Sequence, residues 1–213
     1  MTKKETVIKA LRDNHFEVFS VSSPEEAKQV FIEKILTAAQ PATISYGDSE
    51  TMRGTGVINY LKNCDHYTFI DTFDKNDTWR TQIHKRKQAL TADMFLAGTN
   101  AITLKGQLVN LDMIGNRIAA MTFGPRHVVL FCGMDKVIDN LDEAMRVIQE
   151  IRAPLNAQRH PDLNTPCQFD GKCHHCKSSH RICNAWSIIE KSYPKHRIKI
   201  VLMDANTLHS EKI

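Results

Sequence analysis

The chain has 213 residues, of which 42% are hydrophobic and 24% are charged, as in ordinary globular proteins. A chain of this length fits one domain and buries roughly 70% of the surface of its unfolded form, so it needs neither disulfides nor metal to fold. The net charge of +4 is small. The one dense basic run, residues 84–87, is interpreted as a solvated helix face, so nucleic acid is not expected as a partner.

The N-terminus indicates a cytoplasmic location. Residues 1–5 lead into an amphipathic stretch and not into an apolar segment, which predicts no secretory signal. No run of about 18 apolar residues is present, which predicts no membrane span. In the reducing cytoplasm the six cysteines are expected to be thiols or metal ligands. Cys64 and Cys132 lie in apolar sequence and are interpreted as buried core thiols.

Helices and strands alternate along the chain. Apolar periodicity and capping residues predict helices over residues 3–14, 23–40, 49–63, 78–90, 118–121 and 140–152, the last ended by Pro154. Strands are predicted over residues 42–46, 67–70, 94–97, 127–132 and 197–203, with a hairpin of 102–104 and 107–111 across Lys105-Gly106. This order predicts an α/β fold with a mainly parallel twisted sheet, helices on both faces and an antiparallel hairpin.

A cysteine-rich segment is the sharpest chemical feature of the sequence. Cys167, Cys173, Cys176 and Cys183 have the spacing C-x5-C-x2-C-x6-C, in a stretch of low periodicity from 154 to 184. Four thiolates offset the ordering entropy of such a loop when they bind a metal. The compact run favours an iron–sulfur cluster over zinc, although it matches neither standard ferredoxin pattern. Free thiols in a loop are the remaining alternative.

Two glycine-containing loops follow predicted strands. Gly47, Ser49 and Thr51 lie between a strand and a helix, and Gly98, Thr99 and Asn100 follow a later strand. In open α/β sheets, ligands bind at the carboxyl ends of strands, where backbone N–H groups favour anions. The loops are therefore candidate sites for a small anion, although plain loop geometry also explains them. Neither a Walker loop nor the dinucleotide fingerprint is present.

A third cluster, residues 110–117, begins with Asn110 and surrounds one glycine turn. Its candidate ligand residues are Asp112, Gly115, Asn116 and Arg117. An arginine here can bind a carboxylate or phosphate with two hydrogen bonds. An Asp–Arg pair that closes the loop is an equally good interpretation.

Several ordered blocks resemble the LUD-domain family. They are residues 97–103, 106–112, 115–121 and 123–128, followed by 142–144, 153–157 and 173–184, so that the resemblance spans the chain from about residue 5 to the last strand. Within the family, the chain resembles lactate-utilisation protein C. Two positions depart from the family pattern: Met113-Ile114 make the glycine turn more apolar, and Asp48 stands where relatives often carry glycine and would repel a phosphate.

The resemblance implies one LUD-like domain over residues 1–213, with 154–184 as a Cys-rich insertion before the last strand. It also implies a sheet like that of ribose-phosphate isomerase, glucosamine-phosphate deaminase and the coenzyme A transferases. The function that it implies is a subunit or accessory of an L-lactate oxidation system, beside iron–sulfur partner proteins, with a small carboxylate or acyl ligand at the glycine loops. Arg117 would hold the anion.

Two other functions stay open at this stage. One is a stand-alone isomerase, transferase or ligase acting on a phosphorylated or acyl substrate, for which Glu50 is the nearest candidate carboxylate. The other is a binding module whose cysteine segment is a structural zinc loop.

Overall fold

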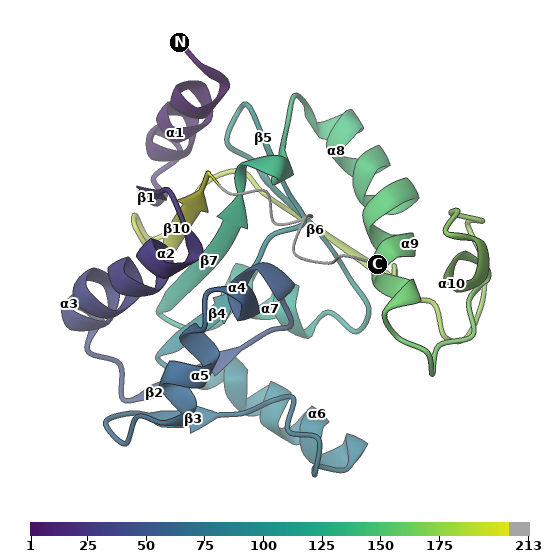
Figure 1. The fold of residues 1–213 in the computed structure, drawn as a ribbon, viewed down its shortest axis with the longest axis horizontal. Coiled ribbons are helices and arrows are strands. Elements are labelled where there is room, and N and C mark those ends of the chain that lie inside the picture. The colour runs from purple at the N-terminus through teal and green to yellow at the C-terminus, as the bar shows by residue number, and fades with distance from the viewer. Residues whose placement is uncertain (205–213) are drawn as a thin grey trace.

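The computed structural model describes residues 1–204, so the end of the predicted domain, 205–213, lies outside the described residues. Two sheets form its framework (Figure 1). The larger sheet has six parallel strands, in the order β1 (Glu17–Val21), β10 (Ile198–Met203), β7 (His127–Gly133), β4 (Met94–Ala97), β2 (Thr43–Tyr46) and β3 (Thr68–Ile70). The predicted α/β class with a mainly parallel sheet is confirmed.

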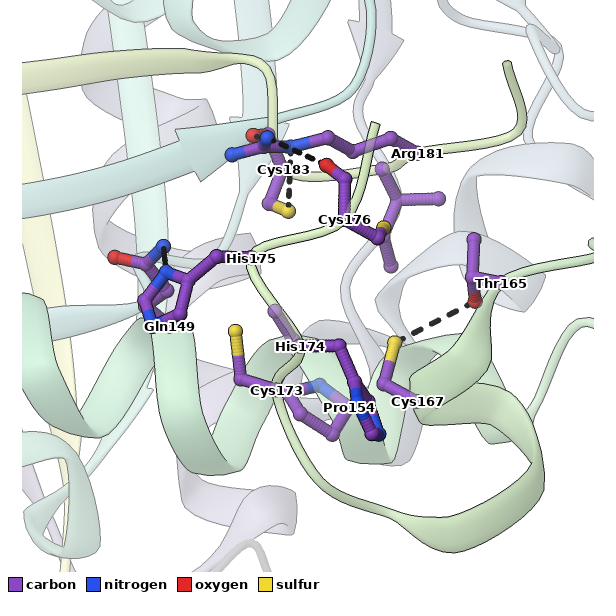
Figure 2. A pocket seen from close by; sticks show the side chains of 12 residues that line it. Gln149, Pro154, Thr165, Cys167, Cys173, His174, His175, Cys176, Arg181 and Cys183 are labelled. Atoms are coloured by element: carbon purple, nitrogen blue, oxygen red, sulfur yellow. Dashed lines mark hydrogen bonds between the residues drawn. The ribbon is translucent and has the colours of Figure 1, made fainter. Parts of the chain in front are cut away.

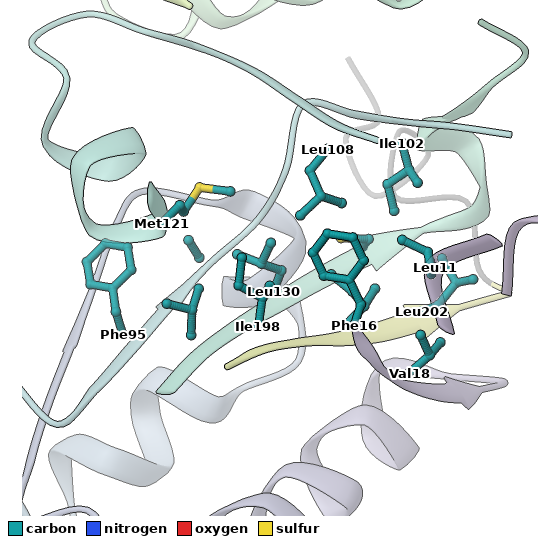
Figure 3. Packing of buried hydrophobic residues seen from close by; sticks show 14 of the residues in the cluster. Leu11, Phe16, Val18, Phe95, Ile102, Leu108, Met121, Leu130, Ile198 and Leu202 are labelled. Atoms are coloured by element: carbon teal, nitrogen blue, oxygen red, sulfur yellow. The ribbon is translucent and has the colours of Figure 1, made fainter. Parts of the chain in front are cut away.

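Alternating side chains of the central strands supply two cores, one on each face of the parallel sheet. On β7, Leu130 and Cys132 point into one core and Val129 and Phe131 into the other. All four are fully buried, as expected for parallel strands that are covered on both faces. Figure 3 shows the first core, where Leu202 of β10 lies near Leu11 of the first helix and Leu130 of β7 lies near Ile198.

The helices divide between these two faces, and hydrogen-bonding side chains begin several of them. One face is covered by α1 (Lys3–Asp13) and α7 (Asn116–Phe123), together with the turn η2 (Ala89–Thr91) that follows α6 (Trp79–Gln88). The other face is covered by α2 (Pro24–Val30), the π-helical turn η1 (Phe31–Leu36), α3 (Thr37–Ala39), α4 (Glu50–Gly54) and α5 (Val57–Lys62). Side chains of Thr2, Ser23 and Thr78 cap α1, α2 and α6, which satisfies free N–H groups of the first turn.

The second sheet is mixed and has the order β8 (Val137–Ile138), β5 (Ala101–Thr103), β6 (Leu108–Asp112) and β9 (Ala185–Ile189). The predicted hairpin is confirmed as the antiparallel pair β5–β6. Gly106 occupies its turn with φ +77°, a conformation that favours glycine. One face of this sheet packs on α8 (Leu141–Val147) and the π-helical turn η4 (Ile148–Arg152).

Two predicted element boundaries were wrong. The helix expected over 49–63 is broken at Gly56, whose φ is +74°. Pro154 does not end its helix, because α9 (Ala153–Gln158) continues from η4 with Pro154 in its first turn. The shift from π to α hydrogen bonding lets the chain accommodate a residue without an N–H group. Strands β1 and β9 and the short α10 (Pro166–Asp170) were not predicted.

The Cys-rich segment starts inside α9, contains α10, and is followed by β9 and then by β10. Within residues 1–204, no helix combines the length and the apolar character that crossing a bilayer requires.

Candidate functional site

The carboxyl ends of three neighbouring strands bring most of the predicted ligand residues together. In the parallel sheet β4 lies between β2 and β7. The loops that follow Tyr46, Ala97 and Gly133 therefore share one edge of the sheet, which we call the strand-end edge. A Cβ placed on Gly47 would lie 3.1 Å from Arg117 Cγ, and one on Gly98 would overlap Ser49 Oγ. The two glycine loops and Arg117 are therefore in direct contact.

Protein atoms fill the space beside both glycines. Gly47 allows Phe95 and Arg117 to approach, and Gly98 allows Ser49 to approach. Several N–H groups of the loops are also used internally: Gly47 donates to Leu96 O at 2.9 Å and Asn100 to Asn110 Oδ1 at 3.1 Å. The glycines thus serve close packing of the two loops, and these N–H groups do not face a ligand.

Arg117 is 8% exposed, and its guanidinium contacts protein acceptors. Nη1 donates to Gly98 O at 3.1 Å and to Asn110 Oδ1 at 2.8 Å. Nη2 donates to Asn100 Oδ1 at 2.7 Å and to Leu111 O at 3.0 Å. Since the terminal nitrogens are occupied in this way, the geometry gives Arg117 a role in holding β6 and the β4–β5 loop together, and its role as an anion ligand stays a prediction.

The other members of the glycine turn build the start of α7. Asp112 Oδ2 accepts from the N–H groups of Arg117 at 2.9 Å and Ile118 at 3.2 Å. Gly115 precedes the helix with φ +84°, and Asn116 is its first residue. A carboxylate in this position complements the positive end of the helix. The expected Asp–Arg contact thus involves the arginine's backbone N–H.

Sequence reasoning missed a lysine at this edge. Lys136, in the turn η3 (Met134–Lys136) after β7, donates from Nζ to Thr51 Oγ1 at 2.8 Å. Burial, and then the charges of Arg152 and Arg117, lower the pKa of Lys136, while Cys132 and Asp135 oppose this shift. Cys132 is fully buried nearby, and burial raises the pKa of its thiol to about 11. No motif spacing singles out a lone lysine after a strand.

Asn110, which belongs to the predicted cluster around the glycine turn, contacts the loop after β4. It is fully buried, and its Oδ1 accepts from Thr99 Oγ1 at 3.1 Å as well as from Asn100 and Arg117. Its Nδ2 is buried and has no acceptor within the part of the chain that the structure describes. A buried donor of this kind calls for a water or ligand oxygen.

The four cysteines of the Cys-rich segment line a single pocket of about 20 Å³ (Figure 2). The pocket lies between the cysteine segment and the helix formed by η4 and α9, whose Gln149 and Pro154 are part of its wall. His174 and His175 also line it.

The two remaining cysteines lie outside this pocket. Cys132 is buried in the core as expected. Cys64 is half-exposed, and its Sγ lies 3.6 Å from His66 Nδ1, so the prediction of a buried Cys64 was wrong.

Polar groups contact two of the four sulfur atoms. Arg181 Nε donates to Cys183 Sγ at 3.1 Å, and Thr165 Oγ1 lies 3.4 Å from Cys167 Sγ. Hydrogen bonds of this type stabilise thiolates and tune a bound metal. Among residues 1–204, no three His, Cys, Asp or Glu side chains are grouped so that they could hold a metal ion as they stand. The set of sulfur donors nevertheless fits zinc or an iron–sulfur cluster in its chemistry.

The helix formed by η4 and α9 lies between the two candidate sites. From η4, Arg152 Nη2 donates to Asp135 O at 2.9 Å, beside Lys136. Gln149 and Pro154 of the same helix line the cysteine pocket. The strand-end edge and the cysteine pocket therefore share one structural element.

This architecture defines an α/β protein with a polar strand-end edge and a separate pocket lined by cysteines. The LUD domain matches residues 4–203, so the chain belongs to the LUD-domain family, which is associated with lactate utilisation. Among solved structures, a DUF162 family protein from Deinococcus radiodurans is similar with a TM-score of 0.50 and 12% identity, over 95% of this chain and 99% of that one. This likeness supports the fold alone. No curated protein matches the sequence.

Proposed function

We propose that this chain is a subunit or accessory of an L-lactate oxidation system and carries a metal centre in its four-cysteine pocket. Membership of the LUD-domain family supports the system. The observation that carries the metal centre is that Cys167, Cys173, Cys176 and Cys183 all line one pocket. Iron–sulfur proteins of the same system are the proposed partners, and the pocket is the proposed contact with them.

The donor set bears on the choice of metal. Four cysteine sulfurs suit a single zinc ion and an iron–sulfur cluster alike, so metal analysis decides between them. A bound ion would supply cross-linking of the segment, and a cluster would supply electron transfer.

A small carboxylate or acyl ligand at the strand-end edge is the second part of the proposal. Its support is the position of the Gly47 loop, the Gly98 loop and Arg117 together at the edge where open α/β sheets bind ligands. Asp48 beside Gly47 disfavours a phosphate, because two negative charges would meet there.

Anaerobic purification with metal and sulfide analysis tests the metal centre. Colourless protein with one zinc per chain supports a zinc centre, and brown protein with iron and sulfide supports a cluster. The variant with Cys173→Ser and Cys176→Ser should lose the metal, because it removes two of the four ligands, while Cys64→Ser should retain it. Wild-type protein that binds neither metal would refute the centre.

Turnover assays separate the accessory from a stand-alone enzyme. The accessory role predicts no lactate oxidation by this chain alone with a range of electron acceptors. Lactate turnover by the isolated chain would contradict the accessory role and favour an enzyme.

A thermal-shift screen with L-lactate, pyruvate and acyl coenzyme A tests ligand binding, because a ligand of the folded state raises the midpoint temperature of unfolding.

A further inference from the structure

Lys136 lies at the edge that the two glycine loops share. Its Nζ contacts Thr51 Oγ1, in the first turn of α4 directly after the Gly47 loop, at 2.8 Å. Its charge also interacts with the Cys132 thiol, which in turn receives a hydrogen bond from the Thr99 backbone, in the loop after β4. The amine therefore faces the place where both predicted ligand loops meet.

The charge of this lysine is poorly compensated. Within residues 1–204 its Nζ forms one hydrogen bond, to a neutral hydroxyl, and no ion pair. Arg152 and Arg117 are near enough for their charges to disfavour a further cation. The neighbouring Asp135 is shared with Arg152, whose Nη1 lies 3.8 Å from Asp135 Oδ2. A half-buried ammonium in such surroundings gains from an anionic partner.

Two further donors belong to the side chains around Lys136. Arg152 Nε is buried and has no acceptor among the described residues, and the same holds for Asn110 Nδ2. The charges of Arg152 and Arg117 both act on Lys136, and Arg117 donates to Asn110 Oδ1. The strand-end edge thus offers more donors than the protein uses.

We propose that Lys136 Nζ binds the carboxylate of a small 2-hydroxy or 2-oxo acid, with Thr51 Oγ1 orienting the ammonium group. The inference rests on the proposed function and names the group that holds its ligand. A singly charged carboxylate fits better than a phosphate for two reasons. Ser49 and Arg117 fill the close approaches at Gly98 and Gly47, and Asp48 repels a second negative charge.

Calorimetric titration with pyruvate and with L-lactate tests this assignment. Lys136→Met should weaken binding about tenfold to a hundredfold, since a hydrogen bond to a charged group is lost. Thr51→Val keeps the charge and should weaken binding by a smaller factor. Lys9→Met is the matched control, because Lys9 lies on the exposed face of α1 and pairs with Asp13. The affinity of this variant for both acids should equal that of the wild type.

A labelling experiment keeps the test independent of how well the variants fold. Pyruvate should slow the modification of Lys136 by methyl acetimidate severalfold in the wild-type protein, as read by mass spectrometry, and leave Lys9 unaffected. If the wild type binds neither acid, both the proposed ligand and this inference fail. If it binds one of them while Lys136→Met binds equally well, or Lys136 is not protected, only the inference fails.

Discussion

Arg117 illustrates how one side chain admits two roles that the structure helps to separate. As a ligand for an anion it would need free terminal nitrogens, but these donate to Gly98 O, Asn110 Oδ1, Asn100 Oδ1 and Leu111 O. Removing the guanidinium leaves these acceptors buried beside an uncharged side chain. The cost of each such group is about 1–3 kcal/mol.

Arg117→Met is therefore expected to lower the free energy of unfolding by about 3 kcal/mol or more, as measured by urea unfolding. Arg146→Met is the control, because Arg146 is half-exposed on α8 and pairs with Glu143 and Glu150, and its loss should cost about 1 kcal/mol or less. An Arg117→Met protein that is as stable as the wild type yet no longer binds small acids would instead establish the anion-binding role.

The residues at the strand-end edge differ in how far sequence could indicate them. Gly47 and Gly98 follow predicted parallel strands, so topology alone places them at one edge, whereas Arg117 follows the hairpin. Lys136 carries no motif, and the sequence indicates Asn110 only as part of the glycine-turn cluster. Their importance comes from what surrounds them: two cations near the amine, and a buried amide nitrogen without an acceptor among the described residues. Such properties exist only after tertiary folding, which is why the sequence did not show them.

At the scale of elements, the β5–β6 hairpin is tied to the first helix through its turn. A Cβ on Gly106 would lie 2.9 Å from backbone atoms of Ala10 and Leu11 in α1. Asn14 Nδ2 also donates to Lys105 O in the same turn at 2.8 Å. The turn thus needs glycine both for its positive φ and for this close approach.

Gly106→Ala is expected to destabilise the protein by at least about 1–2 kcal/mol, the usual cost of a left-handed conformation for an L-residue, with the clash added. Gly54→Ala is the matched substitution, because a Cβ at the end of α4 meets nothing within 4 Å. It should be neutral or raise stability by up to about 1 kcal/mol. Thermal unfolding of both variants compares them directly, and equal midpoints would contradict the packing of the turn against α1.

Some elements were predicted and others missed for reasons that lie in their packing. Strands β4 and β7 are apolar runs buried on both faces, so the sequence identifies them. Strand β9 is only partly buried, and its pairing with β6 depends on a partner far away in the chain. The continuation of the helix past Pro154 depends on the π-helical turn η4 before it, which has no sequence signature.

For the whole molecule, β7 side chains alternate between the two hydrophobic cores, so the parallel sheet joins both cores and lies at the centre of the fold. The second sheet and the helix of η4 and α9 then connect this centre to the cysteine pocket. The chain order of strands and helices was sufficient to predict the parallel sheet. It did not predict a separate second sheet, since this requires β9, from beyond the cysteine segment, to pair with β6.

Cys132 lies in this central core, so its ionisation reports on global stability. Burial raises the pKa of its thiol from 9.0 to about 11 in the folded state, so between these values the unfolded chain has released a proton that the folded chain retains. The stabilisation from the neutral thiol is therefore complete below about pH 9 and is lost as the pH rises towards 11. At about 1.4 kcal/mol per pH unit the loss approaches 3 kcal/mol.

Urea unfolding of the wild type and of Cys132→Ala across this pH range measures the effect. The wild type should lose stability relative to Cys132→Ala between pH 9 and 11, because alanine has no proton to release, and Cys64→Ser should follow the wild type, because Cys64 is half-exposed. The comparison cancels the contributions of ionisable groups that do not interact with Cys132. Parallel curves for wild type and Cys132→Ala would show that the thiol titrates alike in the folded and unfolded states, and would contradict its burial in the core.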